Sequence, residues 1–186
     1  MNIVFEGLPG AGKSTLISEL IKDKNGVLLG EFCEGVTGTL GDIEYFINNE
    51  KKKNEIMKSS PLNQICYVDR LWQSTLVANA VICDVTTKNE LRDLYNIIYK
   101  GYDFEDYIYV FLDIPSEISL RRNVNSEEVR QCMWFDELFN KKAYKMYHLL
   151  YEHLDYVLNK EVRKTLIDTQ KYSLADGVRL INEWLF

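Results

Sequence analysis

The chain has 186 residues, enough for one domain with a substantial core, and its 46% hydrophobic and 27% charged residues are typical of a globular protein. A net charge of −6 argues against non-specific binding to nucleic acid, because phosphate backbones attract basic surfaces. No apolar run reaches the roughly 18 residues that a membrane-spanning helix needs. We therefore expect a single domain over residues 1–186 that binds neither nucleic acid nor membranes.

The four cysteines are widely spaced and form no C-x-x-C pair. The first residues lack the basic flank and cleavage site of a signal peptide. We therefore expect reduced thiols, mostly filling the core, in a cytoplasmic protein. The two histidines, His148 and His153, are five residues apart, so they lie on different faces of a helix and do not predict a metal pair.

Apolar runs that suit β-strands alternate with helical stretches, which predicts an α/β fold with a parallel sheet and crossover helices. The predicted strands are residues 2–6, 26–32, 65–68, 107–112 and 164–167. The predicted helices are residues 13–21, 40–57, 71–81, 90–99, 116–122, 134–158 and 174–185. Three consecutive lysines in the second of these helices, at positions 51–53, are expected on its solvated face.

A glycine-rich turn follows the first predicted strand. Residues 7–14 read Gly-Leu-Pro-Gly-Ala-Gly-Lys-Ser and fit the phosphate-binding pattern G-x-x-x-x-G-K-[ST], with a strand before it and an amphipathic helix after it. Glycines allow successive backbone N–H groups to point inward at a polyanion, and the helix adds its free N–H groups and its dipole. The nucleotide-binding residues predicted from this turn are Gly7, Gly10, Ala11, Gly12, Lys13, Ser14 and Thr15.

Two side chains of the turn have separate predicted tasks. Lys13, expected to be exposed in the loop, would reach the β- and γ-phosphates of a nucleotide such as ATP as a point charge. Ser14 would offer its hydroxyl to Mg²⁺, which prefers oxygen ligands. The turn by itself predicts nucleotide binding and does not say what becomes of the phosphate.

Phosphoryl transfer also needs a carboxylate near the metal ion, and two aspartates end apolar runs. Asp113 follows the more hydrophobic run, whereas Asp69 is followed at once by Arg70. Hydrophobicity favours Asp113, and the adjacent guanidinium, which suits an anionic acceptor, favours Asp69. The residues alone leave both open.

Several segments together resemble the thymidylate kinases. Residues 5–15 carry Phe-Glu-Gly and then Gly-Ala-Gly-Lys-Ser-Thr, and residues 69–79 carry Asp-Arg and a serine-containing helix. Residues 111–122 resemble the strand and helix that lead into that family's lid, and residues 167–168 with the following helix match its C-terminal end. The resemblance is to the thymidylate kinase-like branch of the P-loop kinases, which includes deoxynucleoside kinases. It implies a three-layer α/β/α fold with a five-stranded parallel sheet, acceptor-binding helices and a short lid near residues 122–133.

The resemblance also implies roles near the transferred phosphate. Asp69 would lie near Mg²⁺ with Ser14. We prefer Asp69 to Asp113, which hydrophobicity favours, because Arg70 follows Asp69 directly. Arg70 would contact the acceptor or the transferring phosphate. Glu31 would be the general base for a sugar hydroxyl, with Glu34 as a rival nearby.

Three further positions follow from the same comparison. Ser74 falls in the serine-containing helix of the acceptor region. Asn79 falls where thymidylate kinases place a glutamine that contacts the base. Arg122 would approach the ATP phosphates.

The sequence therefore predicts a P-loop kinase that uses ATP and Mg²⁺ to phosphorylate a nucleoside or a nucleoside monophosphate. Arg70 favours an acceptor that already carries a phosphate, and Glu31 favours a bare hydroxyl, so both acceptors stay open.

The sequence departs from the thymidylate kinases at Pro9, Leu71 and Ala78, and its lid has no basic residue between Arg122 and Arg130. These differences leave two other interpretations open. One is a kinase of a non-nucleotide small molecule. The other is a catalytically weak nucleotide-binding regulatory protein. Dimers are common in the resembled family, and no stripe of residues identifies an interface, so a homodimer is also open.

Overall fold

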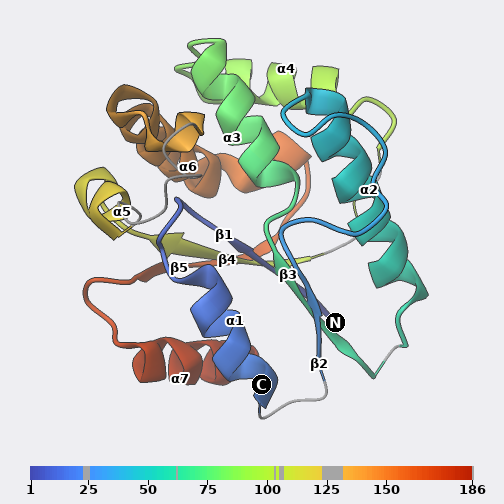
Figure 1. The fold of residues 1–186 in the computed structure, drawn as a ribbon, viewed down its shortest axis with the longest axis vertical. Helices are drawn as coiled ribbons and strands as arrows, with labels where there is room; N and C mark the ends of the chain where they lie inside the picture. The colour runs from blue at the N-terminus through green and yellow to red at the C-terminus, as the bar shows by residue number, and fades with distance from the viewer. Residues whose placement is uncertain (23–25, 62, 103, 105–106, 123–131, 186) are drawn as a thin grey trace.

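Strands of a single parallel sheet run through the middle of the molecule (Figure 1). The computed structural model describes residues 1–22, 26–61, 63–102, 104, 107–122 and 132–185. In this part of the chain the sheet has five strands in the order β2-β3-β1-β4-β5. They are β1 (Asn2–Glu6), β2 (Gly26–Leu29), β3 (Ile65–Asp69), β4 (Ile108–Asp113) and β5 (Arg163–Asp168). The predicted α/β class with a five-stranded parallel sheet is confirmed.

Helices cover both faces of the sheet. They are α1 (Lys13–Lys22), α2 (Ile43–Ser59), α3 (Trp72–Ile82), α4 (Lys88–Ile98), α5 (Ser116–Arg122), α6 (Glu137–Leu158) and α7 (Leu174–Leu185), with a 3₁₀ turn, η2, at Met133–Phe135. Figure 1 shows α1 and α7 on one face and α2, α3, α4 and α6 on the other. The long helix begins at Glu137 rather than at residue 134, because the Asp136 side chain caps it by accepting a hydrogen bond from the Phe139 N–H.

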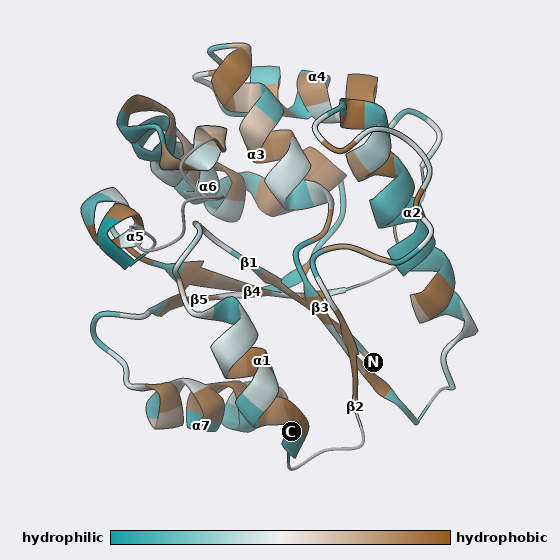
Figure 2. Cartoon of the chain, viewed as in Figure 1, coloured by the Kyte–Doolittle hydropathy of each residue, from teal (hydrophilic) through white to brown (hydrophobic). Residues whose placement is uncertain are grey.

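The central strands are apolar along nearly their whole length, as Figure 2 shows. Ile3, Val4 and Phe5 of β1 and Val110 of β4 are fully buried. A parallel sheet with helices on both faces buries both sides of each strand, so these strands read as continuous apolar runs rather than as alternating ones.

The strand order places a crevice at the carboxyl ends of the strands. β1 pairs with β3 on one side and with β4 on the other, so the sheet order reverses at β1. In open α/β sheets, ligands bind at this point, outside the carboxyl ends. Residues after Glu6, Asp69 and Asp113 therefore meet at one edge.

The four cysteines do not all lie in the core. Cys66 is buried and Cys33 half-buried, but Cys83 and Cys132 are exposed, so the prediction that most cysteines fill the core is wrong; all four are free thiols.

Residues 123–131 of the predicted lid lie outside the described residues. None of the helices in the described ranges is both long and apolar enough to span a membrane.

Candidate active site

The glycine-rich turn at residues 7–14, the phosphate loop, joins β1 to α1. Gly7, Gly10 and Gly12 have φ angles of 138°, 73° and 92°, which side-chain-bearing residues rarely adopt. A Cβ at Gly7 would lie 2.4 Å from the Leu112 carbonyl oxygen, so only glycine lets the loop pass this close to β4. Lys13 is the first residue of α1, so the free N–H groups at this helix N-terminus directly follow the loop.

The Lys13 side chain is buried, with 6% of its surface exposed, and the prediction that it is exposed in the loop is wrong. It folds back over the loop, where Nζ donates hydrogen bonds to the carbonyls of Gly7 and Leu8, both at 3.1 Å. Burial, and then the nearby Arg70 charge, lower the Lys13 pKa to about 7. The loop thus holds its cation at its centre.

A hydroxyl and a carboxylate meet beside the phosphate loop. Ser14 Oγ donates a hydrogen bond to Asp69 Oδ2 at 2.6 Å. The other carboxylate oxygen, Asp69 Oδ1, is buried and has no hydrogen-bond partner among the described residues. An orphaned carboxylate oxygen next to a serine hydroxyl fits Mg²⁺, which binds through one or two protein oxygens and keeps waters and substrate phosphates as its other ligands.

The rival aspartate has a different partner. Asp113 Oδ1 lies 3.0 Å from His148 Nε2, a ring nitrogen from α6. The geometry therefore groups Asp69, and not Asp113, with Ser14.

Lys53 of α2 fixes the backbone at the end of β3. The lysine is 1% exposed, and its Nζ donates to the carbonyls of Asp69 at 2.8 Å and Arg70 at 2.7 Å. Arg70 has a φ of 62°, a left-handed conformation that is uncommon for an arginine. The prediction that lysines 51–53 all lie on a solvated face is wrong at Lys53, which shares a buried face of α2 with Met57.

The Arg70 guanidinium joins the phosphate loop to side chains from α3, from α6 and from the segment that follows β2. Nη1 donates to Gly7 O at 3.2 Å, to Ser74 Oγ at 2.9 Å and to Tyr147 Oη at 3.3 Å. Nε forms an ion pair with Glu31 Oε1 at 3.2 Å. The Arg70 side chain is 10% exposed and that of Glu31 is 51% exposed, so the carboxylate stands at the mouth of the site.

Glu6, at the end of β1, accepts hydrogen bonds that hold the residues after Arg70 in place. It is fully buried and accepts hydrogen bonds from the Leu71 N–H at 2.7 Å and from Ser74 Oγ at 2.6 Å. Burial raises the Glu6 pKa, while the Arg70 charge opposes that rise. Glu6 thereby orients the first turn of α3, which carries Ser74.

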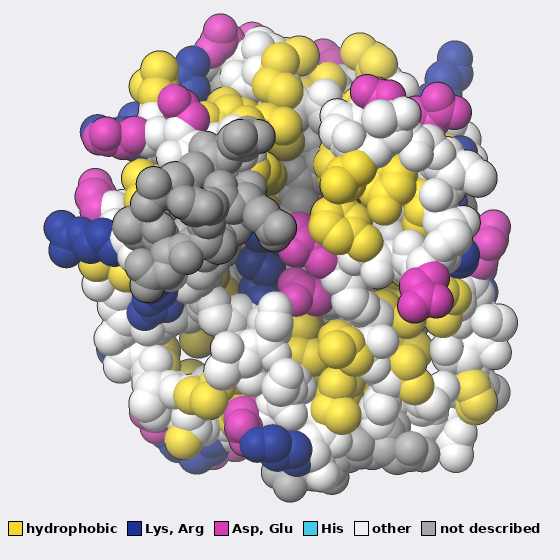
Figure 3. All heavy atoms as spheres, viewed as in Figure 1, with side chains coloured by type: hydrophobic (Ala, Val, Ile, Leu, Met, Phe, Trp, Pro, Cys, Tyr) yellow, Lys and Arg dark blue, Asp and Glu magenta, His cyan; other side chains and the backbone are white. Residues whose placement is uncertain are grey.

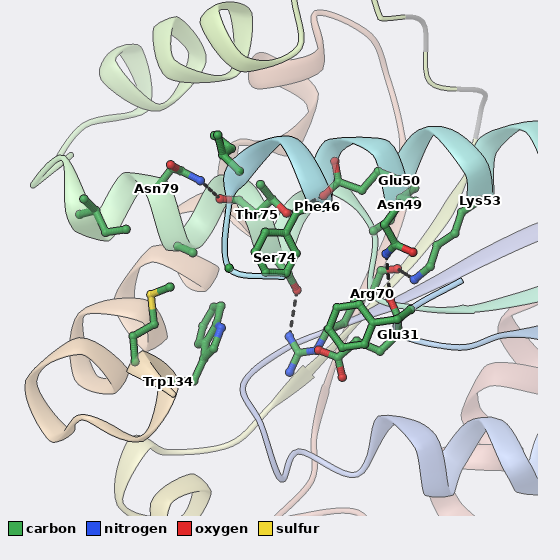
Figure 4. Close-up of a pocket in the computed structure, with 17 residues that line it drawn as sticks. Glu31, Phe46, Asn49, Glu50, Lys53, Arg70, Ser74, Thr75, Asn79 and Trp134 are labelled. Atoms are coloured by element: carbon green, nitrogen blue, oxygen red, sulfur yellow. Dashed lines mark hydrogen bonds and ion pairs between the residues drawn. The ribbon is translucent and has the colours of Figure 1, made fainter. Parts of the chain in front are cut away.

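A cavity of about 240 Å³, the α2–α3 cavity, opens next to Arg70 (Figure 4). Its apolar lining includes Phe32, Ile43, Phe46, Ala78, Ile82, Met133 and Trp134. Its polar lining includes Glu31, Asn49, Glu50, Lys53, Arg70, Ser74, Thr75 and Asn79. Figure 3 shows acidic and basic side chains together in a hollow in the middle of this face, with hydrophobic side chains beside them. A cavity whose lining combines apolar and polar side chains suits a small aromatic molecule that carries polar groups.

Comparisons with known proteins agree with this geometry. An adenylate kinase from Pelagibacter ubique (strain HTCC1062) is 28% identical over 167 residues, which cover 83% of this chain and 73% of that enzyme. Deoxyadenosine kinase from M. mycoides with bound dATP superposes with a TM-score of 0.67 at 20% identity, over 100% of this chain and 99% of that one. The fold is that of the P-loop nucleoside and nucleotide kinases.

Thymidylate kinase from Candida albicans has the same kinase fold, with a TM-score of 0.66 at 17% identity over 98% of this chain and 89% of that one. No protein-family model matches the chain. The relatives in sequence and structure are thus P-loop phosphotransferases, and the resemblance that the sequence suggested is confirmed.

The kinase fold gathers the predicted residues into two groups. Glu31, Arg70, Ser74 and Asn79 line the α2–α3 cavity, where the Asn79 Nδ2 donates to the Thr75 carbonyl at 2.8 Å. The exposed Glu34, the rival of Glu31, is not among the residues that line it.

The second group surrounds the phosphate loop. Arg122 Nη1 donates to the Gly10 carbonyl at 3.0 Å. Beyond the loop lies a second cavity of about 270 Å³, whose lining includes Ala11, Gly12, Thr15, Arg122, Thr169, Tyr172 and Gly177. Space for the remainder of a nucleotide is therefore present next to the loop.

Sequence reasoning missed four side chains of the site: Glu6, Glu50, Lys53 and Trp134. One available signal was the spacing in α2. Phe46, Glu50, Lys53 and Met57 recur every three or four residues, so they share a face with the apolar side chains of that helix.

Proposed function

We propose that this protein is a nucleoside kinase, which transfers the γ-phosphoryl group of ATP to a sugar hydroxyl of a nucleoside with the help of Mg²⁺. The observation that carries the proposal is the Glu31 carboxylate, which lines the α2–α3 cavity and is held 3.2 Å from Arg70 Nε. A hydroxyl acceptor must lose a proton during transfer, and a carboxylate at the end of the cavity supplies a base. A phosphate on the acceptor would instead be repelled by Glu31.

Each part of the site then has a task. The N–H groups of the phosphate loop and the Lys13 ammonium bind the nucleotide phosphates. Arg122, which lies beside the loop, would approach the same phosphates. Ser14 and Asp69 would hold Mg²⁺, which when bound neutralises charge on the β- and γ-phosphates. Glu31 accepts the hydroxyl proton as the new O–P bond forms and the bond to ADP breaks. We also propose that residues 1–186 act as one kinase domain.

A second candidate is a nucleoside monophosphate kinase. The similarity to an adenylate kinase and to a thymidylate kinase favours it. In that reaction Arg70 would leave Glu31 and bind the acceptor phosphate. The two candidates differ in whether the Glu31 carboxylate is needed.

The test is ADP release from MgATP with a panel of nucleosides and nucleoside monophosphates. We expect turnover with nucleosides, and a kcat in Glu31→Gln that is about 10²- to 10⁴-fold lower, the usual contribution of a general base. Glu34→Gln is the matched control, because Glu34 is exposed and is not among the described residues of the cavity lining. Faster turnover with monophosphates, or an unchanged Glu31→Gln variant, would favour the second candidate.

A further inference from the structure

The segment that follows β2 carries Glu31 and has no regular structure of its own. Residues 31–33 belong to no helix or strand. The Glu31 side chain is 51% exposed, and a half-exposed side chain has several rotamers open to it. A general base works only within hydrogen-bond reach of the proton that it accepts, at about 2.6–3.2 Å. The contacts that fix the Glu31 backbone therefore matter for the proposed reaction.

One side chain of α2 holds this backbone. Asn49 Nδ2 donates a hydrogen bond to the Glu31 carbonyl at 2.9 Å, a contact that Figure 4 marks. Asn49 Oδ1 accepts a hydrogen bond from the Cys33 N–H at 2.8 Å. The two hydrogen bonds involve the peptide groups on both sides of Phe32, so the amide bridges α2 and the segment at two points. Asn49 is 5% exposed, so little water competes for these hydrogen bonds.

Two neighbouring side chains of α2 contact the same loop at other places. Asn48 Nδ2 donates to the Thr37 carbonyl at 3.3 Å, and Lys52 Nζ donates to the Glu34 carbonyl. Of these three contacts between α2 and the loop, the one made by Asn49 includes the peptide group of Glu31 itself.

The same face of α2 also holds the ion-pair partner of Glu31. Lys53 follows Asn49 by four residues, which is about one helical turn, and it donates to the carbonyl of Arg70 at 2.7 Å. One face of the helix therefore binds the backbone beneath both members of the Glu31–Arg70 pair. The separation of 3.2 Å between Arg70 Nε and Glu31 Oε1 is thus supported from a single helix.

We propose that Asn49 is a positioning residue for phosphoryl transfer, which acts through Glu31 by holding that carboxylate at the end of the α2–α3 cavity. This inference rests on the proposed function, in which Glu31 accepts the proton of the acceptor hydroxyl. Although Asn49 lines the cavity, both polar groups of its amide already bind the backbone, so its role requires no contact with the acceptor. A shift of a reacting group by about 1 Å costs up to about 10²-fold in rate, so loss of these two hydrogen bonds should lower kcat.

The experiment measures kcat and KM with MgATP and whichever of deoxyadenosine, deoxycytidine, thymidine and deoxyguanosine is phosphorylated fastest. Asn49→Ala should lower kcat about 10- to 100-fold and change the KM for the nucleoside much less. Asn48→Ala is the matched control, because Asn48 is the same residue type at the neighbouring position and bonds the loop at Thr37. This control should leave kcat unchanged.

A double-mutant cycle separates positioning from a general structural role. If Asn49 acts through Glu31, Asn49→Ala should lower kcat in the wild-type protein and have little further effect in Glu31→Gln. A structural role, or a direct contact of Asn49 with the acceptor, would lower kcat by the same factor in both backgrounds.

A second variant covers the case in which Asn49→Ala does not fold. Asn49→Asp has nearly the same size, keeps the acceptor for the Cys33 N–H and loses the donor to the Glu31 carbonyl. It should also lower kcat in the wild-type protein, again with little further effect in Glu31→Gln.

The outcomes distinguish this inference from the proposed function. Absence of turnover with all four nucleosides, or an unchanged kcat in Glu31→Gln, would overturn the proposed function and this inference with it. A large loss in Glu31→Gln together with wild-type kcat in the Asn49 variants, or with equal losses in both backgrounds, would overturn only the role of Asn49.

Discussion

Replacing Gly7 by alanine should destabilise the protein more than replacing Gly12, although both belong to the same loop. Each has a positive φ, 138° at Gly7 and 92° at Gly12, and such strain costs about 1–3 kcal/mol for a residue with a side chain. At Gly7 the new Cβ would also lie 2.4 Å from the Leu112 carbonyl oxygen, whereas at Gly12 nothing lies within 4 Å. Forcing atoms into a packed region adds about 1–3 kcal/mol. The expected losses are about 4 kcal/mol for Gly7→Ala and about 2 kcal/mol for Gly12→Ala.

Thermal unfolding measures the difference. In a chain of this length 1 kcal/mol shifts Tm by about 2–4 °C, so Gly7→Ala should lower Tm by about 8–16 °C and Gly12→Ala by about 4–8 °C. Gly12→Ala, with the smaller stability loss, should still weaken ATP binding, because its methyl group alters the loop that faces the phosphates. Equal Tm losses in the two variants would refute the assignment of the close approach to Gly7.

Three other outcomes follow from the site. Lys13→Met should abolish turnover without loss of stability in urea unfolding, because burial already disfavours the Lys13 charge and lowers its pKa to about 7; a large stability loss would contradict this. Asp69→Asn should raise the Mg²⁺ concentration needed for half-maximal activity more than Asp113→Asn does, and the reverse order would point to Asp113 as the metal ligand. Between about pH 4.5 and 8 the folded chain keeps a proton on Glu50 that the unfolded chain releases, so stability should fall as pH rises, by at most about 1.4 kcal/mol per pH unit. Glu50→Gln should flatten that pH dependence of the unfolding free energy, and equal slopes in both proteins would show that Glu50 is ionised when folded.

The fold and the phosphate loop were predictable because local pattern determines them. Continuous apolar runs report strands buried on both faces, and the glycines of residues 7–14 report a backbone that only glycine adopts. The choice between Asp69 and Asp113 was not predictable from hydrophobicity. Both strands flank β1, and the burial of a strand does not tell which carboxylate turns toward Ser14 and which toward His148.

The hydrogen-bond partners of Lys53 could not be predicted from the sequence. Three consecutive lysines carry the composition of a solvated surface, and only the helical spacing that Lys53 shares with Phe46, Glu50 and Met57 distinguishes it from the other two. Its burial depends on two backbone carbonyls that the fold brings to it from the end of β3. Such a partner is a property of the tertiary structure, and a helical pattern gives at most the face on which to look.

The same lysine has a consequence for how variants of α2 behave. Helix α2 contributes Phe46 and Glu50 to the cavity and, through Lys53, donates hydrogen bonds to the carbonyls of the two peptide groups on either side of Arg70. Under the proposed function, the helix would therefore connect the cavity that selects the acceptor to the backbone that positions Asp69 and Arg70 for phosphoryl transfer. We therefore expect substitutions in α2 that change the acceptor preference to change the rate of transfer as well.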